Sequence, residues 1–295
     1  MTSPNAYDPP VALEGENKGL GPGRRRPGSD ADRRMMRAVI GMETSGMVRD
    51  AVIALGHDAI SVDLLEHQRG GPHHVGDVFA FLAQGPVFDF GVFHPECTYH
   101  TGSAAWAFND PDYARYPGVG YHQRLKPGTL FGKDRRDARE RAEADVRRIR
   151  ALPFPKVIEN PVGTLSAPRN LGPAHQIVQP YQFGADASKK TCLWFFDAEG
   201  RPMFTRLRVR PDQYVKPRLW CPACDRCSPY DSAFSWGCVH CGGEPGRLLP
   251  RWANQTDHGQ NKLSPALADR WKVRSDTYPG IAAAIAEAMT GSAPQ

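Results

Sequence analysis

The sequence contains no run of about 18 apolar residues, the length that a helix needs to cross a bilayer, so we expect no membrane association. Its N-terminal segment has no apolar core typical of a secretory signal, and we therefore expect a cytoplasmic protein. Two glycine-rich phosphate-binding patterns, G-x-G-x-x-G and G-x-x-x-x-G-K-[ST], are also missing. These absences argue against a membrane protein, a secreted protein and an enzyme that holds a nucleotide mainly through its phosphates.

The composition is that of a globular chain with many loops. Of its 295 residues, 40% are hydrophobic, which is enough for one large domain or two small ones. The 29 glycines and 27 prolines indicate short elements joined by loops. The net charge of +5 permits a polyanionic partner, although such an excess is also typical of a solvated surface. Residues 1–36 predict a disordered basic tail that either touches DNA phosphates or only aids solubility.

One cysteine and one glutamate each follow a short apolar run. Cys97 comes just after residues 87–93, and Glu159-Asn160 follows residues 156–158. Both runs predict buried strands, and the carboxyl ends of strands are where α/β folds place their chemistry. A thiolate can add to an electron-poor ring carbon while a nearby acid protonates the ring nitrogen that gathers charge. The alternative is a structural core cysteine and an unrelated surface acid.

The N-terminal half predicts alternating strands and helices. Residues 37–42 and 59–63 have strand patterns, and residues 47–55 between them have a helical pattern. Asp63 ends the second strand twenty residues after Glu43, the spacing at which a dinucleotide-type fold places an acid on a ribose hydroxyl. A third acid, Asp77, follows residues 75–76. Acids at three strand ends favour a ligand with hydroxyls and an exocyclic amine.

The order of these motifs resembles that of the DNA (cytosine-5) methyltransferases, particularly short, divergent members found in phages, over residues 38–196 and again near the C-terminus. The resemblance implies a doubly wound, Rossmann-like α/β methyltransferase core in a bacterial or phage-infected cell. It implies that S-adenosylmethionine is bound by the first turn and by the acids of the second and third strands, here Glu43, Ser45, Gly46, Asp63 and Asp77.

The same resemblance assigns the chemistry. Cys97 matches the nucleophile of the family's proline-cysteine motif, although Glu96 replaces a proline and should raise the pKa of the thiol. Glu159-Asn160 matches the family's glutamate-asparagine motif. Residues 181–190 are similar to a segment with two arginines, of which only Lys189 preserves a cation. Residues 278–289 are similar to the C-terminal helix that packs beside the cofactor.

Four cysteines in two C-x-x-C pairs lie thirteen residues apart. This spacing is typical of a zinc ribbon, in which four thiolates surround one structural Zn²⁺. We predict the ligands Cys221, Cys224, Cys238 and Cys241, with Cys227 and His240 as spare donors. The alternative of disulfides is disfavoured in a reducing compartment.

Arginines and aromatic residues alternate around these cysteines, a pattern that suits nucleic-acid contact, although a small module also buries aromatics to enlarge its core. We further predict contacts with DNA phosphates at five cations, or generic polar loops at the last four of them: Lys189, Lys262, Arg270, Lys272 and Arg274. Residues 133–152 predict a helix whose arginines form a solvated face paired with acids.

The combined hypothesis is a monomeric DNA cytosine methyltransferase with four regions. These are the tail at 1–36, the core at 37–205, an inserted zinc ribbon at 206–255 and a segment at 256–295 that completes the core. Cys97 adds to carbon 6 of a flipped cytosine, Glu159 acts at nitrogen 3, and Asn160 positions Glu159 or the cysteine loop. Two alternatives stay open: a related enzyme acting on RNA or a nucleotide, and a catalytically silent nucleic-acid-binding protein.

Overall fold

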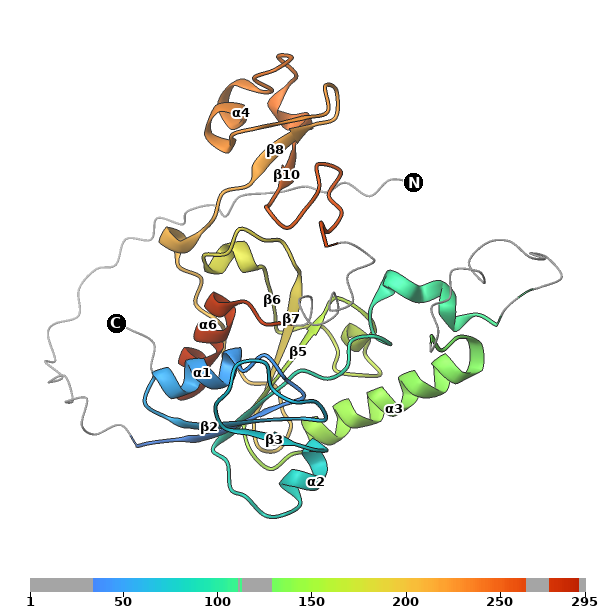
Figure 1. Cartoon of the computed structure of the whole chain (residues 1–295), viewed down its shortest axis with the longest axis vertical. Helices are drawn as coiled ribbons and strands as arrows, with labels where there is room; N and C mark the ends of the chain where they lie inside the picture. The colour runs from blue at the N-terminus through green and yellow to red at the C-terminus, as the bar shows by residue number, and fades with distance from the viewer. Residues whose placement is uncertain (1–33, 111, 113–128, 264–275, 292–295) are drawn as a thin grey trace, which may run out of the picture. The chain divides into compact units, whose positions relative to one another are not determined.

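Seven strands form one mixed sheet in the order β3-β2-β1-β4-β5-β7-β6 (Figure 1). The computed structural model describes residues 34–110, 112, 129–263 and 276–291. The strands of this sheet are β1 (Arg37–Gly41), β2 (Asp58–Asp63), β3 (His73–Val75), β4 (Phe90–Phe93), β5 (Lys156–Pro161), β6 (Gln176–Val178) and β7 (Thr191–Phe196). The helices of the core are α1 (Met47–Ala54), α2 (Val78–Leu82), α3 (Gly132–Arg150) and α6 (Pro279–Thr290), with short 3-10 helices η2 (Gly102–Phe108), η4 (Thr164–Ser166), η5 (Pro180–Phe183) and η6 (Pro211–Gln213).

The strands from β3 to β5 are parallel, and the direction of the winding reverses between β1 and β4. Their order is that of a doubly wound nucleotide-binding sheet, which binds ligands at the carboxyl ends beside the reversal. The prediction of an α/β fold is therefore confirmed, and the sheet is compatible with a Rossmann-like core. Strand β7 is antiparallel to both β5 and β6, and the sequence patterns did not predict this hairpin.

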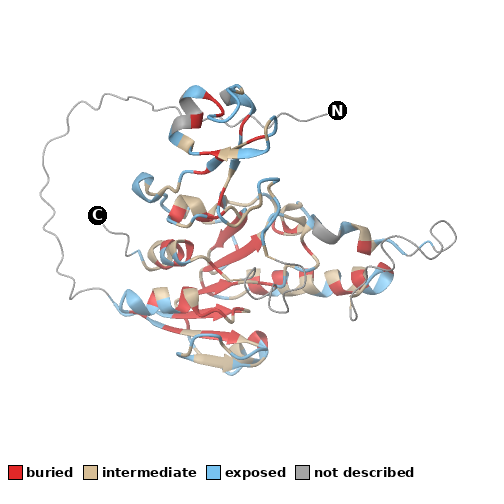
Figure 2. Cartoon of the chain, turned by 45° about the horizontal axis from the view of Figure 1, so that its top comes forward, coloured by how far each residue is buried: buried red, intermediate tan, exposed pale blue. Residues whose placement is uncertain are grey.

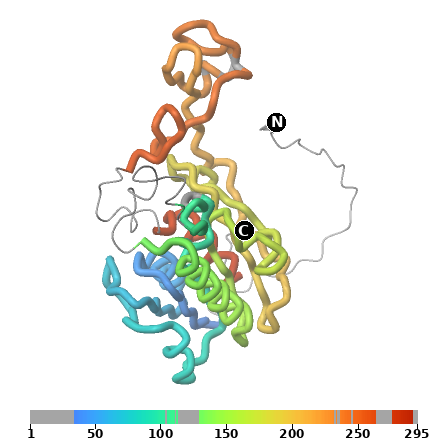
Figure 3. Tube along the Cα trace, turned by 90° about the vertical axis from the view of Figure 1, so that its right-hand side faces the viewer, coloured from blue at the N-terminus to red at the C-terminus, as the bar shows by residue number. Residues whose placement is uncertain are grey.

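Helices cover both faces of the sheet, so the central strands are buried (Figure 2). On one face α1 and α6 pack together over β1, β4, β5 and β7, and Figure 3 shows the red C-terminal helix beside the blue first helix. On the other face α2 and α3 pack on the same strands through side chains that include Phe79, Val146 and Ile149. Burial on both sides explains why β4 and β7 are almost entirely apolar.

A second, three-stranded antiparallel sheet has the order β10-β8-β9. It consists of β8 (Arg218–Cys221), β9 (Arg226–Ser228) and β10 (Leu249–Arg251), with helix α4 (Tyr230–Trp236) and the 3-10 helix η7 (Pro245–Arg247). Its small core contains two of the predicted metal ligands among apolar side chains: Leu219, Cys221, Ala233, Cys238 and Leu248. We call residues 218–251 the cysteine module.

None of the helices among the described residues is both long and apolar enough to cross a membrane. The predicted basic tail at 1–36 falls almost entirely outside the described residues, and β1 begins immediately after it at Arg37.

Candidate active site and metal centre

The loops that carry the predicted chemistry meet at the carboxyl ends of β1, β4 and β5. Residues 42–46 follow β1, and residues 94–97 follow β4. Glu159 lies inside β5, where it is opposite Leu193 of β7, because the strand continues to Pro161 past the apolar run that predicted it. Glu159 is therefore held in the sheet by its pairing with β7. The sequence patterns did not predict this antiparallel pairing.

Cys97 is half-buried and lies within electrostatic range of Glu159. Burial raises the pKa of the Cys97 thiol, and the Glu159 carboxylate raises it further, while Lys189 lowers it. Glu96 is exposed and has the smallest of these effects, although it too raises the pKa. Glu96 therefore raises the pKa of the Cys97 thiol less than Glu159 does.

The imidazole of His94 lies beside the Glu159 carboxylate. Its Nδ1 atom lies 3.4 Å from Oε2 of Glu159, and the side chains are only 9% and 11% exposed. Burial alone would raise the pKa of Glu159, but the hydrogen bond from His94, the charge of Lys189 and a hydrogen bond from Thr191 together lower it. The geometry around Glu159 thus favours the ionised carboxylate.

Two hydrogen-bonded contacts fix the loop that carries Cys97. Nδ2 of Asn160 donates to the carbonyl oxygen of Pro95 at 2.8 Å, so the asparagine holds the cysteine loop against β5. The backbone N–H of Thr164 donates to the carbonyl of His100 at 2.8 Å, and Thr101 forms a β-bridge with Gly163.

Arg135 of α3 reinforces this loop from the helical side. Its Nη2 donates to the carbonyl of Thr98 at 3.0 Å, and its guanidinium lies over the rings of Tyr99 and Phe108. The side chain is buried, with 3% exposure. The prediction that the arginines of this helix form a solvated face is therefore wrong for Arg135, because tertiary contacts select one arginine from an otherwise uniform charged pattern.

The first turn after β1 is closed by its own side chains. The Glu43 carboxylate accepts hydrogen bonds from the N–H groups of Gly46 and Met47 at 3.0 and 3.3 Å, and from the Ser45 hydroxyl. Gly46 has φ of 70°, and a Cβ at this position would collide with the buried guanidinium of Arg49. These three predicted cofactor residues therefore cap α1, and Glu43 has little capacity left for a ligand.

Two further acids face Glu43. Asp63 at the end of β2 is partly buried, and desolvation raises the pKa of its carboxyl, as does the Glu43 charge, against the lowering effects of the Leu65 N–H and of His73. Asp276, just before α6, has its pKa raised by burial and by Glu43, and its Oδ1 atom is buried without a hydrogen-bond partner among the described residues. The sequence patterns missed Asp276, because no motif surrounds it.

Asp77 has a structural role. It is the N-cap of α2, and its Oδ1 accepts from the N–H of Ala80 at 2.8 Å. The residue is exposed, so its second oxygen is accessible.

Lys189 follows Ser188, a residue that contacts the segment after the cysteine module. Its backbone N–H donates to Oε1 of Gln179 at 2.9 Å, and its charge acts on Cys97 and Glu159. The preceding Ser188 exchanges two hydrogen bonds with the Asn254 side chain, each of 2.9 Å. We call this pair of bonds the Ser188–Asn254 link.

A second contact lies beside the link. The ring of Tyr181 stacks on Trp252 at 4.1 Å with 9° between the planes, and the N–H of Ala253 donates to Asp186. Of the other predicted nucleic-acid contacts, Lys262 is exposed, whereas Arg270, Lys272 and Arg274 lie outside the described residues.

Four cysteine sulfurs come together in the cysteine module. The Sγ atoms of Cys221, Cys224, Cys238 and Cys241 all lie within 4.8 Å of one another. Two of the separations are 3.7 and 3.5 Å. Thiolates at the corners of a zinc tetrahedron lie about 3.8 Å apart, given Zn–S bonds of about 2.3 Å. The group can therefore hold a metal ion such as zinc.

The two spare donors lie outside this group. Sγ of Cys227 donates to Asp257, and Nε2 of His240 contacts the carbonyl of Cys227.

Burial would raise the pKa of Cys238, but the N–H groups of His240 and Cys241 lower it to about 6. Such N–H donors stabilise the thiolate that a metal requires.

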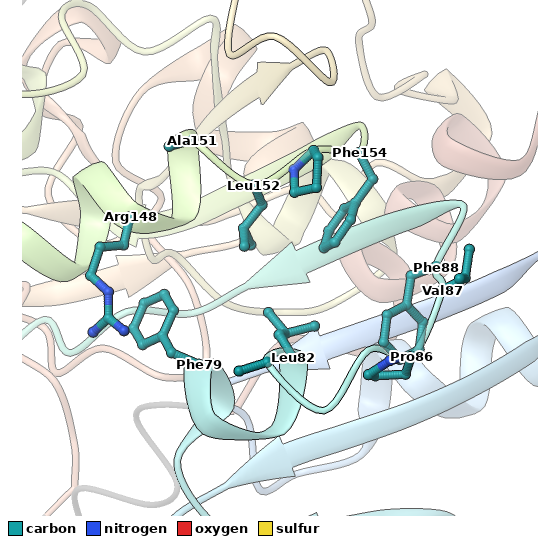
Figure 4. Close-up of a pocket in the computed structure, with 11 residues that line it drawn as sticks. Phe79, Leu82, Pro86, Val87, Phe88, Arg148, Ala151, Leu152 and Phe154 are labelled. Atoms are coloured by element: carbon teal, nitrogen blue, oxygen red, sulfur yellow. The ribbon is translucent and has the colours of Figure 1, made fainter.

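A cavity of about 550 Å³ lies near the amino ends of the central strands β4 and β5. Figure 4 shows Phe79 and Leu82 of α2 facing Leu152 and Phe154, which precede β5. Because ligands of doubly wound sheets bind at the carboxyl ends of the strands, this apolar cavity is separate from the candidate active site.

Comparison of the sequence with protein-family models and with curated proteins gave no match.

Proposed function

We propose that this protein is an S-adenosylmethionine-dependent DNA cytosine-5 methyltransferase. The observation that carries the proposal is the pairing of Cys97 with Glu159 at the carboxyl ends of neighbouring strands, next to the reversal point of the sheet. A nucleophile and an acid–base group on adjacent strands can act on one planar ring. The family resemblance of the sequence motifs supports the same assignment.

The cysteine performs the addition. The Cys97 thiolate forms a bond to carbon 6 of a cytosine that has left the helix stack, and the ring electrons shift toward carbon 5 and nitrogen 3. Lys189 stabilises the thiolate, because its charge lowers the pKa of Cys97. Asn160 and Arg135 hold the backbone on either side of the cysteine, so the sulfur is positioned before substrate binds.

The acidic region beside the cysteine supports S-adenosylmethionine as the cofactor, and the cofactor would supply an electrophilic methyl group. Its sulfonium and ammonium groups are cationic, whereas a dinucleotide is anionic. Glu43 raises the pKa of both Asp63 and Asp276, and such a concentration of negative charge disfavours phosphates. Asp63 and the unpartnered Oδ1 of Asp276 would accept hydrogen bonds from the cofactor, and Asp77 would receive the adenine amine.

The cysteine module would hold a structural zinc ion, because four thiolates leave no coordination position open for substrate. Trp236 of this module is 84% exposed, whereas Trp252, which follows the module, is buried with 6% exposure.

The strand register supports a DNA-contacting face on the same module. Arg218, Trp220 and Arg251 lie on one side of its sheet, opposite the buried Leu219 and Cys221. The Arg251 guanidinium lies 5.3 Å from the Trp220 ring centroid. Trp220 is half-buried, and a partly accessible aromatic ring with flanking arginines can stack on a base and contact phosphates.

Covalent trapping tests the proposal directly. The protein is incubated with S-adenosylmethionine and duplex DNA that contains 5-fluorocytosine, and its intact mass is measured. Because fluorine cannot leave as a proton does, a methyltransferase stays attached to the DNA. We expect an adduct with the wild-type protein and none with Cys97→Ser, since a hydroxyl is a much weaker nucleophile than a thiolate.

The matched control is Cys227→Ser, which alters a free thiol outside both the active site and the metal group and should still form the adduct. The same reaction with competing RNA or cytidine nucleotide identifies the preferred substrate. An adduct with Cys97→Ser, or none with any cytosine-containing substrate, would contradict the proposed function.

A further inference from the structure

His94 and Glu159 form a buried pair whose chemistry the sequence motifs leave unassigned. The imidazole Nδ1 lies 3.4 Å from Oε2 of the carboxylate. The other ring nitrogen, Nε2, is buried and has no hydrogen-bond partner among the described residues. His94 follows β4 directly, three residues before Cys97, so the pair and the nucleophile share one loop.

The proposed reaction gives this pair a task. Addition of the thiolate to carbon 6 places negative charge on the ring, and nitrogen 3 needs a proton to accept that charge. Glu159 is held in its ionised form by His94, Lys189 and Thr191, so it has no proton of its own to give. A protonated imidazole in hydrogen-bonding contact can supply one.

We propose that His94 stores the proton that Glu159 delivers to the pyrimidine ring nitrogen, an inference that rests on the proposed function. In this inference the stored proton lies on the imidazole of His94, beside the Glu159 carboxylate. As the bond between Cys97 sulfur and carbon 6 forms, one proton moves from Nδ1 of His94 to Glu159, and one moves from Glu159 to nitrogen 3.

Protons and charges balance at each stage of the reaction. After addition, His94 is neutral, Glu159 is again a carboxylate and the ring is neutral. Once carbon 5 has received the methyl group that S-adenosylmethionine would supply, it loses its proton to a base. The bond to sulfur then breaks with its electron pair returning to Cys97, and the nitrogen proton returns through Glu159 to His94. His94 is therefore a positioning and proton-storing residue that acts through Glu159.

Other charged groups near the pair do not replace His94. Lys189 acts on both Cys97 and Glu159, but its ammonium would have to lose the charge that lowers the pKa of the Cys97 thiol. Cys97 itself loses its proton before addition. Thr191 has a hydroxyl that titrates outside the accessible pH range. An imidazole is the side chain best suited to hold a proton and pass it on, and that of His94 lies beside Glu159.

Substitution by asparagine separates proton storage from a structural role. In His94→Asn the side-chain amide replaces Nδ1 as a hydrogen-bond donor but cannot carry a transferable proton. We expect the rate of adduct formation with 5-fluorocytosine DNA to fall by about 10²–10⁴-fold near neutral pH. We also expect the rate maximum to move to lower pH, because Glu159 must then take its proton from solvent.

Zinc content and binding of S-adenosylhomocysteine show whether the variant is folded, and His94→Gln serves as the second variant if asparagine prevents folding. A rate within threefold of wild type with an unchanged pH profile would overturn the inference. Failure of the wild-type protein to form an adduct would instead contradict the proposed function, so the two failures are distinguishable.

Discussion

At the residue scale, the reactivity of Cys97 depends on neighbouring groups that have opposite effects on the pKa of its thiol. Burial and the Glu159 carboxylate raise the pKa of the thiol above the ordinary cysteine value, and Lys189 lowers it. The thiolate fraction therefore increases only as the solution becomes more alkaline than an ordinary cysteine requires, and the rate of alkylation must increase with it.

Alkylation by iodoacetamide, followed by peptide mass spectrometry as a function of pH, measures this pKa without substrate. We expect Glu159→Gln to move the midpoint for Cys97 to lower pH, because it removes a negative charge. We expect Lys189→Gln to move it to higher pH, because it removes a positive one. Glu96→Gln is the control and should change the midpoint least. Shifts of the same sign in the first two variants would contradict the arrangement.

Individual residues also show what the sequence could not predict. Cys97 and Glu159 were found because each directly follows a recognisable apolar run. His94 is part of the same local motif, but its contact with Glu159 joins two strands and has no local signal. Asp276 and Arg135 are ordinary charged residues in sequence, and their burial depends on packing that no periodicity encodes.

At the scale of elements, the loop after β4 and the loop after β5 touch at one glycine. A Cβ built on Gly163 would lie 1.9 Å from the carbonyl oxygen of His100, so the two loops can approach only where a side chain is absent. Its φ of 177° is accessible to any residue, and the requirement for glycine is therefore steric.

Gly163→Ala should separate these loops. We expect the free energy of unfolding, measured by urea denaturation, to fall by about 1–3 kcal/mol, the usual cost of overpacking. Adduct formation at Cys97 should also slow, because His100 is hydrogen-bonded to the Cys97 carbonyl. Gly102→Ala is the matched control, since a Cβ there meets nothing within 4 Å. Equal stabilities of the two variants would show that the loops can move apart freely.

The elements themselves were predicted unevenly. Strands β1 and β2 and helices α1 and α3 were expected from local sequence patterns, and α6 was expected from the family resemblance. The structure contains all five near the expected bounds. The β6–β7 hairpin depends on non-local antiparallel pairing, which an apolar run alone does not specify. Strand β4 begins at Phe90, later than the apolar run that predicted it. Val87, at the start of that run, lies outside the strand beside the cavity in Figure 4 and is 76% exposed.

At the scale of the whole molecule, the Ser188–Asn254 link joins the segment that follows the cysteine module to the candidate active site. Asn254 follows β10, which pairs with β8, the strand that ends at the predicted ligand Cys221, and Ser188 precedes Lys189. Loss of the metal should therefore disturb the cation that lowers the pKa of Cys97.

Removal by a chelator of the zinc ion that we propose for the module should slow alkylation of Cys97 at a fixed, mildly alkaline pH. The midpoint of the pH dependence should move upward, as in Lys189→Gln. Asn254→Ala should reproduce this change with the metal still bound, as measured by elemental analysis. Asn261→Ala, in the neighbouring exposed loop, is the control. Unchanged Cys97 reactivity in both the chelated protein and Asn254→Ala would mean that the module and the active site are independent.

The packing of α6 on α1 has a consequence for the synthesis of the chain. The two helices cover one face of the central sheet together, yet they come from opposite ends of the core sequence. While the chain is being translated, Val48, Val52 and Ile40 stay exposed until Ile285 has left the ribosome. The cysteine module, whose contacts are local, can capture its metal earlier. We therefore expect the nascent core to depend on chaperones until its last helix is made.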